Sequence, residues 1–233
     1  MGDLIDKVVL ITGSSSGIGE ALAIEYAKLG AQIALHGRNK QKLDEVRRRV
    51  ELITANVRVF CYDLSRLSNS QALVDDVTSS FGKEISILVN NAGIAIHGHI
   101  DNIPMDQYEY ITYLNLLAPV SLCKLVLPIM KQKGGTIINI TSGIGVEGMP
   151  GISAYSFTKS AFTAFCESLY YEFHDESIKI FVVSPGLVET SFASKIKTYG
   201  RIKEPFIRGR YRSAETVAKK ILERVRKQEN FID

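Results

Sequence analysis

Residues 155–159 (YSFTK) place a phenol and an ammonium group four positions apart, at Tyr155 and Lys159. If the segment is helical, the two side chains share one face, one turn apart. A cation within ~4–6 Å of a phenol favours the ionised form and lowers a pKa that is normally about 10. The pair is therefore a candidate for proton transfer near neutral pH. A packed tyrosine beside a solvated lysine is the alternative.

Ser142 is the candidate that would complete such a site, because it closes the apolar run 135–142. Strand ends of a doubly wound sheet face the ligand crevice. The helix that carries Tyr155 begins about a dozen residues later, so the two hydroxyls can meet in one cleft. Taken alone, Ser142 would be a turn or capping residue.

The segment TGSSSGIG (12–19) follows the first apolar run and has three closely spaced glycines. Glycines permit positive φ and let the backbone approach a pyrophosphate, while a helix N-terminus offers free N–H groups. A tight strand-to-helix turn is the alternative, but it needs only one glycine. The expected phosphate contacts are Gly13, Ser15, Ser16, Gly17, Ile18 and Gly19.

The bulk composition suits one globular domain over residues 1–233, with 45% hydrophobic and 23% charged residues. A net charge of +3 gives little support to a nucleic-acid partner. The run MGDLIDKVVLITG lacks the bases of a signal peptide, and no 18 consecutive apolar residues predict a membrane span. Cys61, Cys123 and Cys166 lie in apolar contexts, so we expect buried reduced thiols and a cytoplasmic protein.

Short apolar runs alternate with helical patterns along the chain, which predicts a single-domain doubly wound parallel sheet (Rossmann fold) with helices on both faces. The expected strands are 7–13, 31–37, 57–64, 85–93, 135–142 and 178–186. The expected helices are 21–30, 39–52, 68–82, 105–131, 153–173 and 214–228. Residues 190–212 are basic, aromatic and weakly periodic, and we expect a long substrate-covering loop there.

Six motifs follow one another in a familiar order: TGSSSGIG, NNAG (90–93), Asn115, Ser142, Tyr155-x-x-x-Lys159 and SPGLVET (184–190). Together they resemble the short-chain dehydrogenase/reductase family, in particular its carbonyl-reductase-like members, over residues 6–190. The resemblance implies an NADP-dependent oxidoreductase that acts on a carbonyl compound or a secondary alcohol. It implies that Tyr155 is the acid/base, that Ser142 holds the substrate oxygen, and that Lys159 tunes the tyrosine and holds the nicotinamide ribose.

The resemblance also assigns the remaining cofactor contacts. Those near adenosine would be Asp63, Leu64, Asn90, Ala92 and Gly93, and those from the SPGLVET motif would be Pro185, Gly186, Val188 and Thr190. Two of them have a local alternative, since Asp63 could cap the following segment and Thr190 could cap the loop.

Pro119 follows Asn115 by four residues within the long helix. Because proline has no N–H, the Asn115 carbonyl loses its helical donor, and a kink is expected. The freed carbonyl needs another partner, and an ordered water is the natural one. In the family, the equivalent main chain holds a water that joins the lysine to solvent. We therefore predict a proton relay from Asn115 through water to Lys159; a kinked packing helix is the alternative.

The end of the second strand predicts the cofactor. An acid there would bind a 2′-hydroxyl and repel a 2′-phosphate, but Gly37 occupies that place and Arg38 follows. A guanidinium fits a phosphate bidentately, so NADP(H) is preferred and NAD(H) remains possible. The alternative is that Arg38 is a surface residue at a helix start.

Substrate choice should depend on residues 94–103, 143–152 and 190–212. His97 and His99 flank one glycine, but no acid or cysteine accompanies them, so we expect no metal site. The chain lacks the glycine-rich terminal strand of 3-oxoacyl-carrier-protein reductases, which disfavours that activity and leaves a homodimer or homotetramer open. Two rival classes are a redox-inert NADP-binding regulator and an interaction or nucleic-acid module that uses the basic loop.

Overall fold

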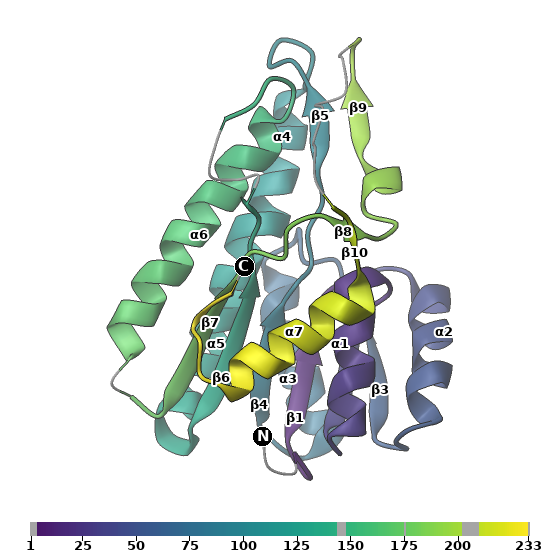
Figure 1. Cartoon of the computed structure of the whole chain (residues 1–233), viewed down its shortest axis with the longest axis vertical. Helices are drawn as coiled ribbons and strands as arrows, with labels where there is room; N and C mark the ends of the chain where they lie inside the picture. The colour runs from purple at the N-terminus through teal and green to yellow at the C-terminus, as the bar shows by residue number, and fades with distance from the viewer. Residues whose placement is uncertain (1–3, 144–147, 175, 202–209, 233) are drawn as a thin grey trace.

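Seven parallel strands form the central sheet, in the order β11-β7-β6-β4-β1-β2-β3. The computed structural model describes residues 4–143, 148–174, 176–201 and 210–232 (Figure 1). The strands are β1 (Val8–Ile11), β2 (Gln32–Gly37), β3 (Val57–Cys61), β4 (Ile85–Asn90), β6 (Gly135–Ile140), β7 (Ile178–Val183) and β11 (Phe231–Ile232). Every neighbouring pair is parallel, so the predicted doubly wound sheet is confirmed.

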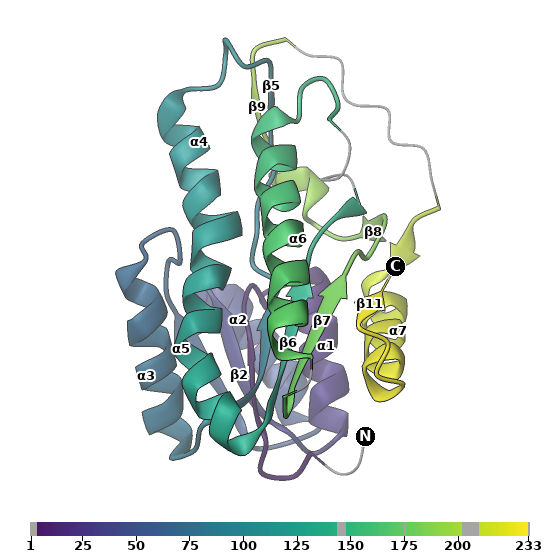
Figure 2. The same cartoon turned by 90° about the vertical axis from the view of Figure 1, so that its left-hand side faces the viewer.

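Helices cover both faces of the sheet (Figure 2). One face carries α1 (Gly17–Lys28), α2 (Lys40–Glu51) and α7 (Ala214–Arg226), and the other carries α3 (Ser68–Phe81), α5 (Ala118–Lys133) and α6 (Ser153–Phe173). Successive strand residues point to opposite faces. In β1, Val9 and Ile11 therefore pack with the first group, and Val8 and Leu10 with the second. This double burial explains why β1 reads as a continuous apolar run.

The long helix predicted over 105–131 is interrupted. It consists of α4 (Met105–Thr112), a π-helical turn (Tyr113–Leu117) and α5. The N–H of Ala118 donates to the carbonyl of Tyr113, five residues back. Within the run Met105–Lys133, an 18-residue window has a mean hydropathy of 1.6, so by length and composition this run could cross a membrane. A core helix has the same properties, and here Leu122, Val126 and Met130 are buried against the sheet.

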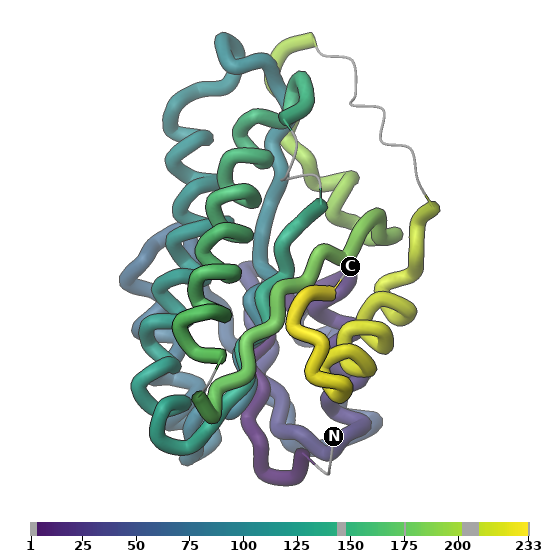
Figure 3. Tube along the Cα trace, turned by 60° about the vertical axis from the view of Figure 1, so that its left-hand side comes forward, coloured from purple at the N-terminus to yellow at the C-terminus, as the bar shows by residue number. Residues whose placement is uncertain are grey.

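The end of the chain corrects one expectation. It lacks a glycine-rich sequence, but it still adds a strand, because β11 pairs with β7 (Figure 3). Val182 N donates to Asn230 O at 2.7 Å, and Ser184 N donates to Ile232 O at 2.7 Å. Backbone groups alone make these bonds, so composition gave no signal for them.

Short elements extend beyond the carboxyl ends of the sheet strands (Figure 1). Strand β5 (Ile96–Gly98) pairs with β9 (Lys197–Tyr199), and β8 (Val188–Glu189) pairs with β10 (Arg212–Ser213). A 3₁₀ turn, Ala193–Lys195, lies between β8 and β9. The expected loop over 190–212 is therefore partly structured, although residues 202–209 lie outside the described part of the chain.

The expectation of three buried thiols is wrong for one of them. All three cysteines are free, and Cys123 and Cys166 are buried, but Cys61 is exposed. Strand β3 is the edge of the sheet, and Cys61, its last residue, is exposed there together with Arg58.

Candidate active site

The glycine loop is held by the segment that follows β4. Asn91 Nδ2 donates to the carbonyl of Thr12 at 2.8 Å and to that of Gly13 at 3.2 Å. The Thr12 hydroxyl accepts from the N–H groups of Asn91 and Ala92 at 2.9 and 3.0 Å. The approach is so close that a Cβ on Gly13 would lie 2.8 Å from Ala92 Cα, and one on Gly19 would lie 2.6 Å from Asn91 Nδ2. These two positions therefore require glycine for the loop to keep this shape.

The start of α1 suits an anion. Ser16 precedes the helix with an extended backbone, and its side chain makes no capping hydrogen bond. The first-turn N–H groups are consequently open to a ligand such as a phosphate. Gly17 has a φ of +63°, and a Cβ there would lie 2.9 Å from Thr190 Cγ2. Ser15, Ile18 and Thr190 thus gather at this turn, as the sequence predicts.

The Tyr155 hydroxyl shares a hydrogen bond with the side chain of Ser142. Ser142 follows the carboxyl end of β6, and Tyr155 lies in the first turn of α6. Burial raises the pKa of Tyr155, and the bond with Ser142 acts against that rise by lowering it. The two side chains predicted to meet in one cleft do meet.

Lys159 is buried, and its environment differs from the prediction. Lys159 Nζ donates to the carbonyl of Ile140 at 3.0 Å, and burial lowers its pKa to about 8. The expected lowering of the pKa of Tyr155 by Lys159 is wrong for the protein without cofactor, since burial and Ser142 are what act on that hydroxyl. An ammonium group has three donors. One of them holds Lys159 to the end of β6, which leaves two for other partners.

Asn115 lies in the π-helical turn, so the helix is irregular just before Pro119, while the predicted kink stays a prediction. Its side chain does more than the sequence suggested. Asn115 Nδ2 donates to the Ile94 carbonyl at 2.9 Å and to the Thr158 hydroxyl at 3.3 Å. A Cβ on Gly93 would lie 3.2 Å from Asn115 Oδ1 and 3.8 Å from Lys159 Nζ. Gly93 therefore lies close to both the asparagine side chain and the lysine ammonium group. The water relay itself stays a prediction.

A family model described as short chain dehydrogenase matches residues 7–199. The chain belongs to the short-chain dehydrogenase/reductase family. The dehydrogenase/reductase SDR family protein 7-like of Anopheles gambiae is 36% identical over 237 residues, which cover 97% of this chain and 74% of the relative.

Solved structures of other short-chain dehydrogenases share the fold. An NADPH complex of the enzyme from Sphingobium yanoikuyae superposes with a TM-score of 0.85 at 27% identity, over 97% of this chain and 87% of that one. An NAD complex from Burkholderia phymatum gives 0.88 at 22% identity, over 100% and 90% of the two chains. The second likeness, at that identity, concerns the fold alone.

Arg38 follows β2 directly and is exposed, so its guanidinium is accessible to a ligand. Its Nη1 donates to the hydroxyl of Tyr110, and its guanidinium carbon lies 5.9 Å from the centroid of that ring. Tyr110 belongs to α4, 72 residues away in sequence. The guanidinium is thus held against Tyr110, next to the end of β2, rather than left free in solvent.

The residues expected around adenosine divide into two groups. Asp63 Oδ1 accepts from Ser65 N at 3.1 Å, which favours the capping alternative. Asn90 Nδ2 donates to Asn139 Oδ1 at 2.9 Å inside the sheet, so Asn90 joins β4 to β6. Ala92 and Gly93, by contrast, face the glycine loop and the lysine, as described above.

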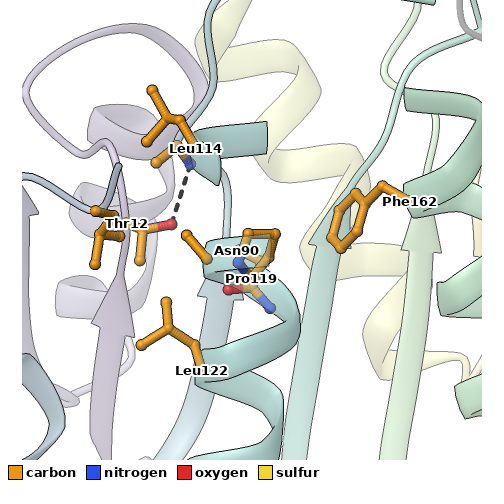
Figure 4. A pocket seen from close by; sticks show the side chains of 9 residues that line it. Thr12, Asn90, Leu114, Pro119, Leu122 and Phe162 are labelled. Carbon is orange, nitrogen blue, oxygen red and sulfur yellow. Dashed lines mark hydrogen bonds between the residues drawn. The ribbon is translucent and has the colours of Figure 1, made fainter. Parts of the chain in front are cut away.

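A small cavity of about 10 Å³ separates the sheet from the long helix (Figure 4). It is lined by Thr12, Leu64, Asn90, Ala92, Leu114, Ala118, Pro119, Leu122 and Phe162. Such a volume holds about one water molecule. Because Leu64 is buried and lines this cavity, an adenosine contact from it would come from its backbone.

The SPGLVET motif and the segment after it run past the glycine loop to Tyr155. Gly186, after Pro185, has a φ of +67°, and Val188 pairs with β10. The ring of Phe192 then lies 6.2 Å from that of Tyr155. The predicted covering segment thus reaches the tyrosine. No cluster of three metal-ligating side chains occurs in the described ranges, and residues 144–147 of the expected substrate segment lie outside them.

Sequence reasoning missed four residues that shape this site: Thr12, Asn91, Tyr110 and Lys195. Thr12 and Asn91 stand inside the recognised motifs, so their position was a usable signal. Tyr110 and Lys195 act across 72 and 179 residues of sequence; Lys195 belongs to the basic stretch recognised over 190–212, but its partner Ser16 could not be foreseen.

Proposed function

We propose that this short-chain dehydrogenase is an NADPH-dependent oxidoreductase that transfers hydride between nicotinamide and a carbonyl compound or secondary alcohol. The observation that carries the proposal is the hydrogen bond between the Tyr155 and Ser142 side chains in a buried site. Lys159 lies one helical turn along from Tyr155, with its ammonium beside Gly93. The phenol and the hydroxyl meet at the end of β6, and the ammonium group is held at the same strand end by the carbonyl of Ile140.

When bound, the nicotinamide supplies hydride to the carbonyl carbon or accepts it in reverse. Tyr155 gives its hydroxyl proton to the carbonyl oxygen during reduction and takes it back during oxidation. The Ser142 hydroxyl donates a hydrogen bond to the same oxygen. The buried Lys159, with a pKa of about 8, exchanges protons close to neutral pH and can restore the tyrosine proton.

The same proposal includes the relay through Asn115. Pro119 has no N–H to offer the Asn115 carbonyl, and the π-helical turn leaves that region irregular. A water on the carbonyl would connect Lys159 to solvent. This arrangement would let Lys159 reload the tyrosine without opening the site.

NADP(H) is the proposed cofactor, and NAD(H) is a weaker one. Support comes from Gly37 in place of an acid at the end of β2 and from the held guanidinium of Arg38. The NADPH complex of the Sphingobium relative is in line with this choice, and the NAD complex of the Burkholderia protein shows that the fold also accommodates the other cofactor. A ratio of kcat/KM that favours NADH in the purified protein would contradict it.

We further propose a small-molecule substrate, a homodimer or homotetramer, and a cytoplasmic location. The three free thiols support a reducing compartment. The terminal strand β11 weakens the argument against a 3-oxoacyl-carrier-protein substrate, because the edge of the sheet is completed after all. Light scattering of the purified protein tests the assembly, and imaging of a tagged full chain tests the location.

The deciding experiment is NADPH oxidation over a panel of ketones, aldehydes and quinones. The variant Tyr155→Phe should lose about 10²–10⁴-fold in kcat/KM, the usual contribution of general acid–base catalysis. Tyr171→Phe is the matched control, since this tyrosine lies on the same helix and is exposed. A Tyr155→Phe protein with unchanged turnover would contradict the acid/base role of Tyr155. NADPH binding by the wild type without turnover of any compound would favour a redox-inert regulator.

A further inference from the structure

Three cations from two segments lie in the region of the glycine loop: Lys195, and Arg38 and Lys42 at the start of α2. Lys195 Nζ donates to the hydroxyl of Ser16 at 3.1 Å, across 179 residues of sequence. Partial burial lowers the pKa of Lys195, and the charges of Lys42 and Arg38 lower it further, so all three groups share one region. Within the described ranges, none of the three takes part in an ion pair.

Like charges that gather repel one another, and a bound anion lowers this cost, although Asp63 acts on Tyr110 together with Arg38 and offsets part of it. Arg38 and Lys42 flank the start of α2, directly after β2. This is the part of a doubly wound fold that reads the 2′ position of the adenosine ribose. A 2′-phosphate carries the charge that the three groups require.

We infer that Lys195 is a specificity-determining residue that binds the 2′-phosphate of the cofactor together with Arg38 and Lys42. The inference rests on the proposed NADPH preference and adds a residue from the covering segment. Arg38 is held by Tyr110 of α4, whereas Lys195 is held by Ser16 of the glycine loop. The phosphate would thus be held by the sheet edge and by the segment that covers the site.

The path of the covering segment supports the assignment. Thr190 packs on Gly17, and the Ser191 hydroxyl donates to that of Ser16 at 3.4 Å. One 3₁₀ turn then links Phe192, beside Tyr155, to Lys195, beside Ser16. At about 2 Å of rise per residue, this turn carries the chain away from Tyr155, where the nicotinamide would lie. The lysine side chain then extends further, towards the adenosine half of the cofactor.

Lys195→Met removes the charge and keeps most of the side chain. An exposed charge-assisted bond is at the weaker end of its range, so the Kd for NADPH should rise about tenfold. The Kd for NADH should change less than about twofold, because that cofactor lacks the phosphate. Lys195→Arg should recover most of the affinity.

Lys197→Met is the matched control, since Lys197 is an exposed cation two residues along in β9. It should change neither Kd by more than about twofold. Binding is measured by nicotinamide fluorescence, which needs no substrate. Adenosine 2′,5′-bisphosphate and 5′-AMP are the matching probes without nicotinamide, and Lys195→Met should weaken only the first.

The outcomes are distinct. If the wild type binds NADH as tightly as NADPH, the proposed cofactor preference fails and this inference fails with it. If the wild type prefers NADPH but Lys195→Met behaves like Lys197→Met, only the inference fails. If Lys195→Met weakens NADH and NADPH equally, Lys195 binds the pyrophosphate instead, and its role in specificity is overturned.

Discussion

Asn115 and Ile94 exchange two hydrogen bonds through the asparagine side chain. Ile94 N donates to Asn115 Oδ1 at 2.9 Å, and Asn115 Nδ2 donates to Ile94 O at 2.9 Å. The pair fastens the π-helical turn to the loop after β4, beside the lysine. The sequence pointed to the backbone carbonyl of Asn115, and the structure shows that its side chain also holds two elements together.

Replacing Asn115 with leucine should cost about 2–4 kcal/mol of unfolding free energy. Leucine has nearly the same shape but leaves both backbone groups of Ile94 without their partner, and each such buried group costs about 1–3 kcal/mol. Urea unfolding of the cofactor-free protein measures the change. Asn56→Leu, at an exposed position, is the control and should shift stability by less than about 0.5 kcal/mol. Equal losses in the two variants would contradict this role.

Pro119→Ala tests the relay separately from the side chain. Alanine restores an N–H four residues after Asn115, which can then bond the carbonyl within a regular helix. We expect kcat to fall about three- to tenfold while the protein becomes no less stable. Steady-state turnover and thermal unfolding are the two measurements. Pro128→Ala lies in the same helix and provides the control, because its residue is remote from the site. Unchanged kcat with a more stable protein would contradict the relay and would mean that the irregular helix serves only packing.

The sheet was predictable because buried parallel strands are continuous β-branched runs, and VVLI and IINI both became strands at the expected places. The irregular helical turn at Asn115 was predictable because Pro119, four residues later, has no N–H. The motif residues Gly13, Gly17 and Gly19 lie at the predicted strand-to-helix junction, where Gly17 and Gly19 form the first turn of α1.

Contacts between distant segments were not predictable. The carbonyl of Ile140 that binds Lys159 belongs to a backbone, and any residue type could provide it. Ile232 adds to the sheet edge by backbone bonds as well. The error about Cys61 arose because edge and central strands look alike when a strand is short. The reach of Lys195 depends on the path of a segment whose composition predicted a loop.

Ser142→Ala should move the pH dependence of turnover to higher pH. The bond from Ser142 lowers the pKa of Tyr155, so its loss raises that pKa. Alcohol oxidation needs the ionised tyrosine and rises through this pKa, and carbonyl reduction needs the protonated form and falls above it. Both inflections should therefore shift upwards in profiles of kcat/KM against pH. The rate itself should fall about 10²–10³-fold, as when an oxyanion donor is lost.

Ser142→Thr keeps the hydroxyl and is the control for this experiment. It should retain the wild-type inflection even if crowding by the added methyl lowers the rate. An inflection that stays in place or moves downwards in Ser142→Ala would show that the serine does not tune the tyrosine.

Lys159→Met should remove a pH dependence of stability. Burial lowers the pKa of Lys159 from 10.5 to about 8 in the folded protein. Between these values the unfolded chain binds more protons than the folded one, so stability rises with pH. Below about pH 8 both states are protonated, and the folded protein bears the full cost of a buried charge. The wild type should therefore gain about 3 kcal/mol relative to Lys159→Met from pH 8 to 10.5.

Urea unfolding of both proteins at several pH values from 7 to about 10.5 measures this difference. The constant cost of leaving the Ile140 carbonyl without its donor cancels when slopes are compared. Lys124→Met, at an exposed position on α5, should run parallel to the wild type. Parallel curves for wild type and Lys159→Met would mean that the ammonium is already well solvated, and that Lys159 could not exchange protons near neutral pH as the proposed mechanism requires.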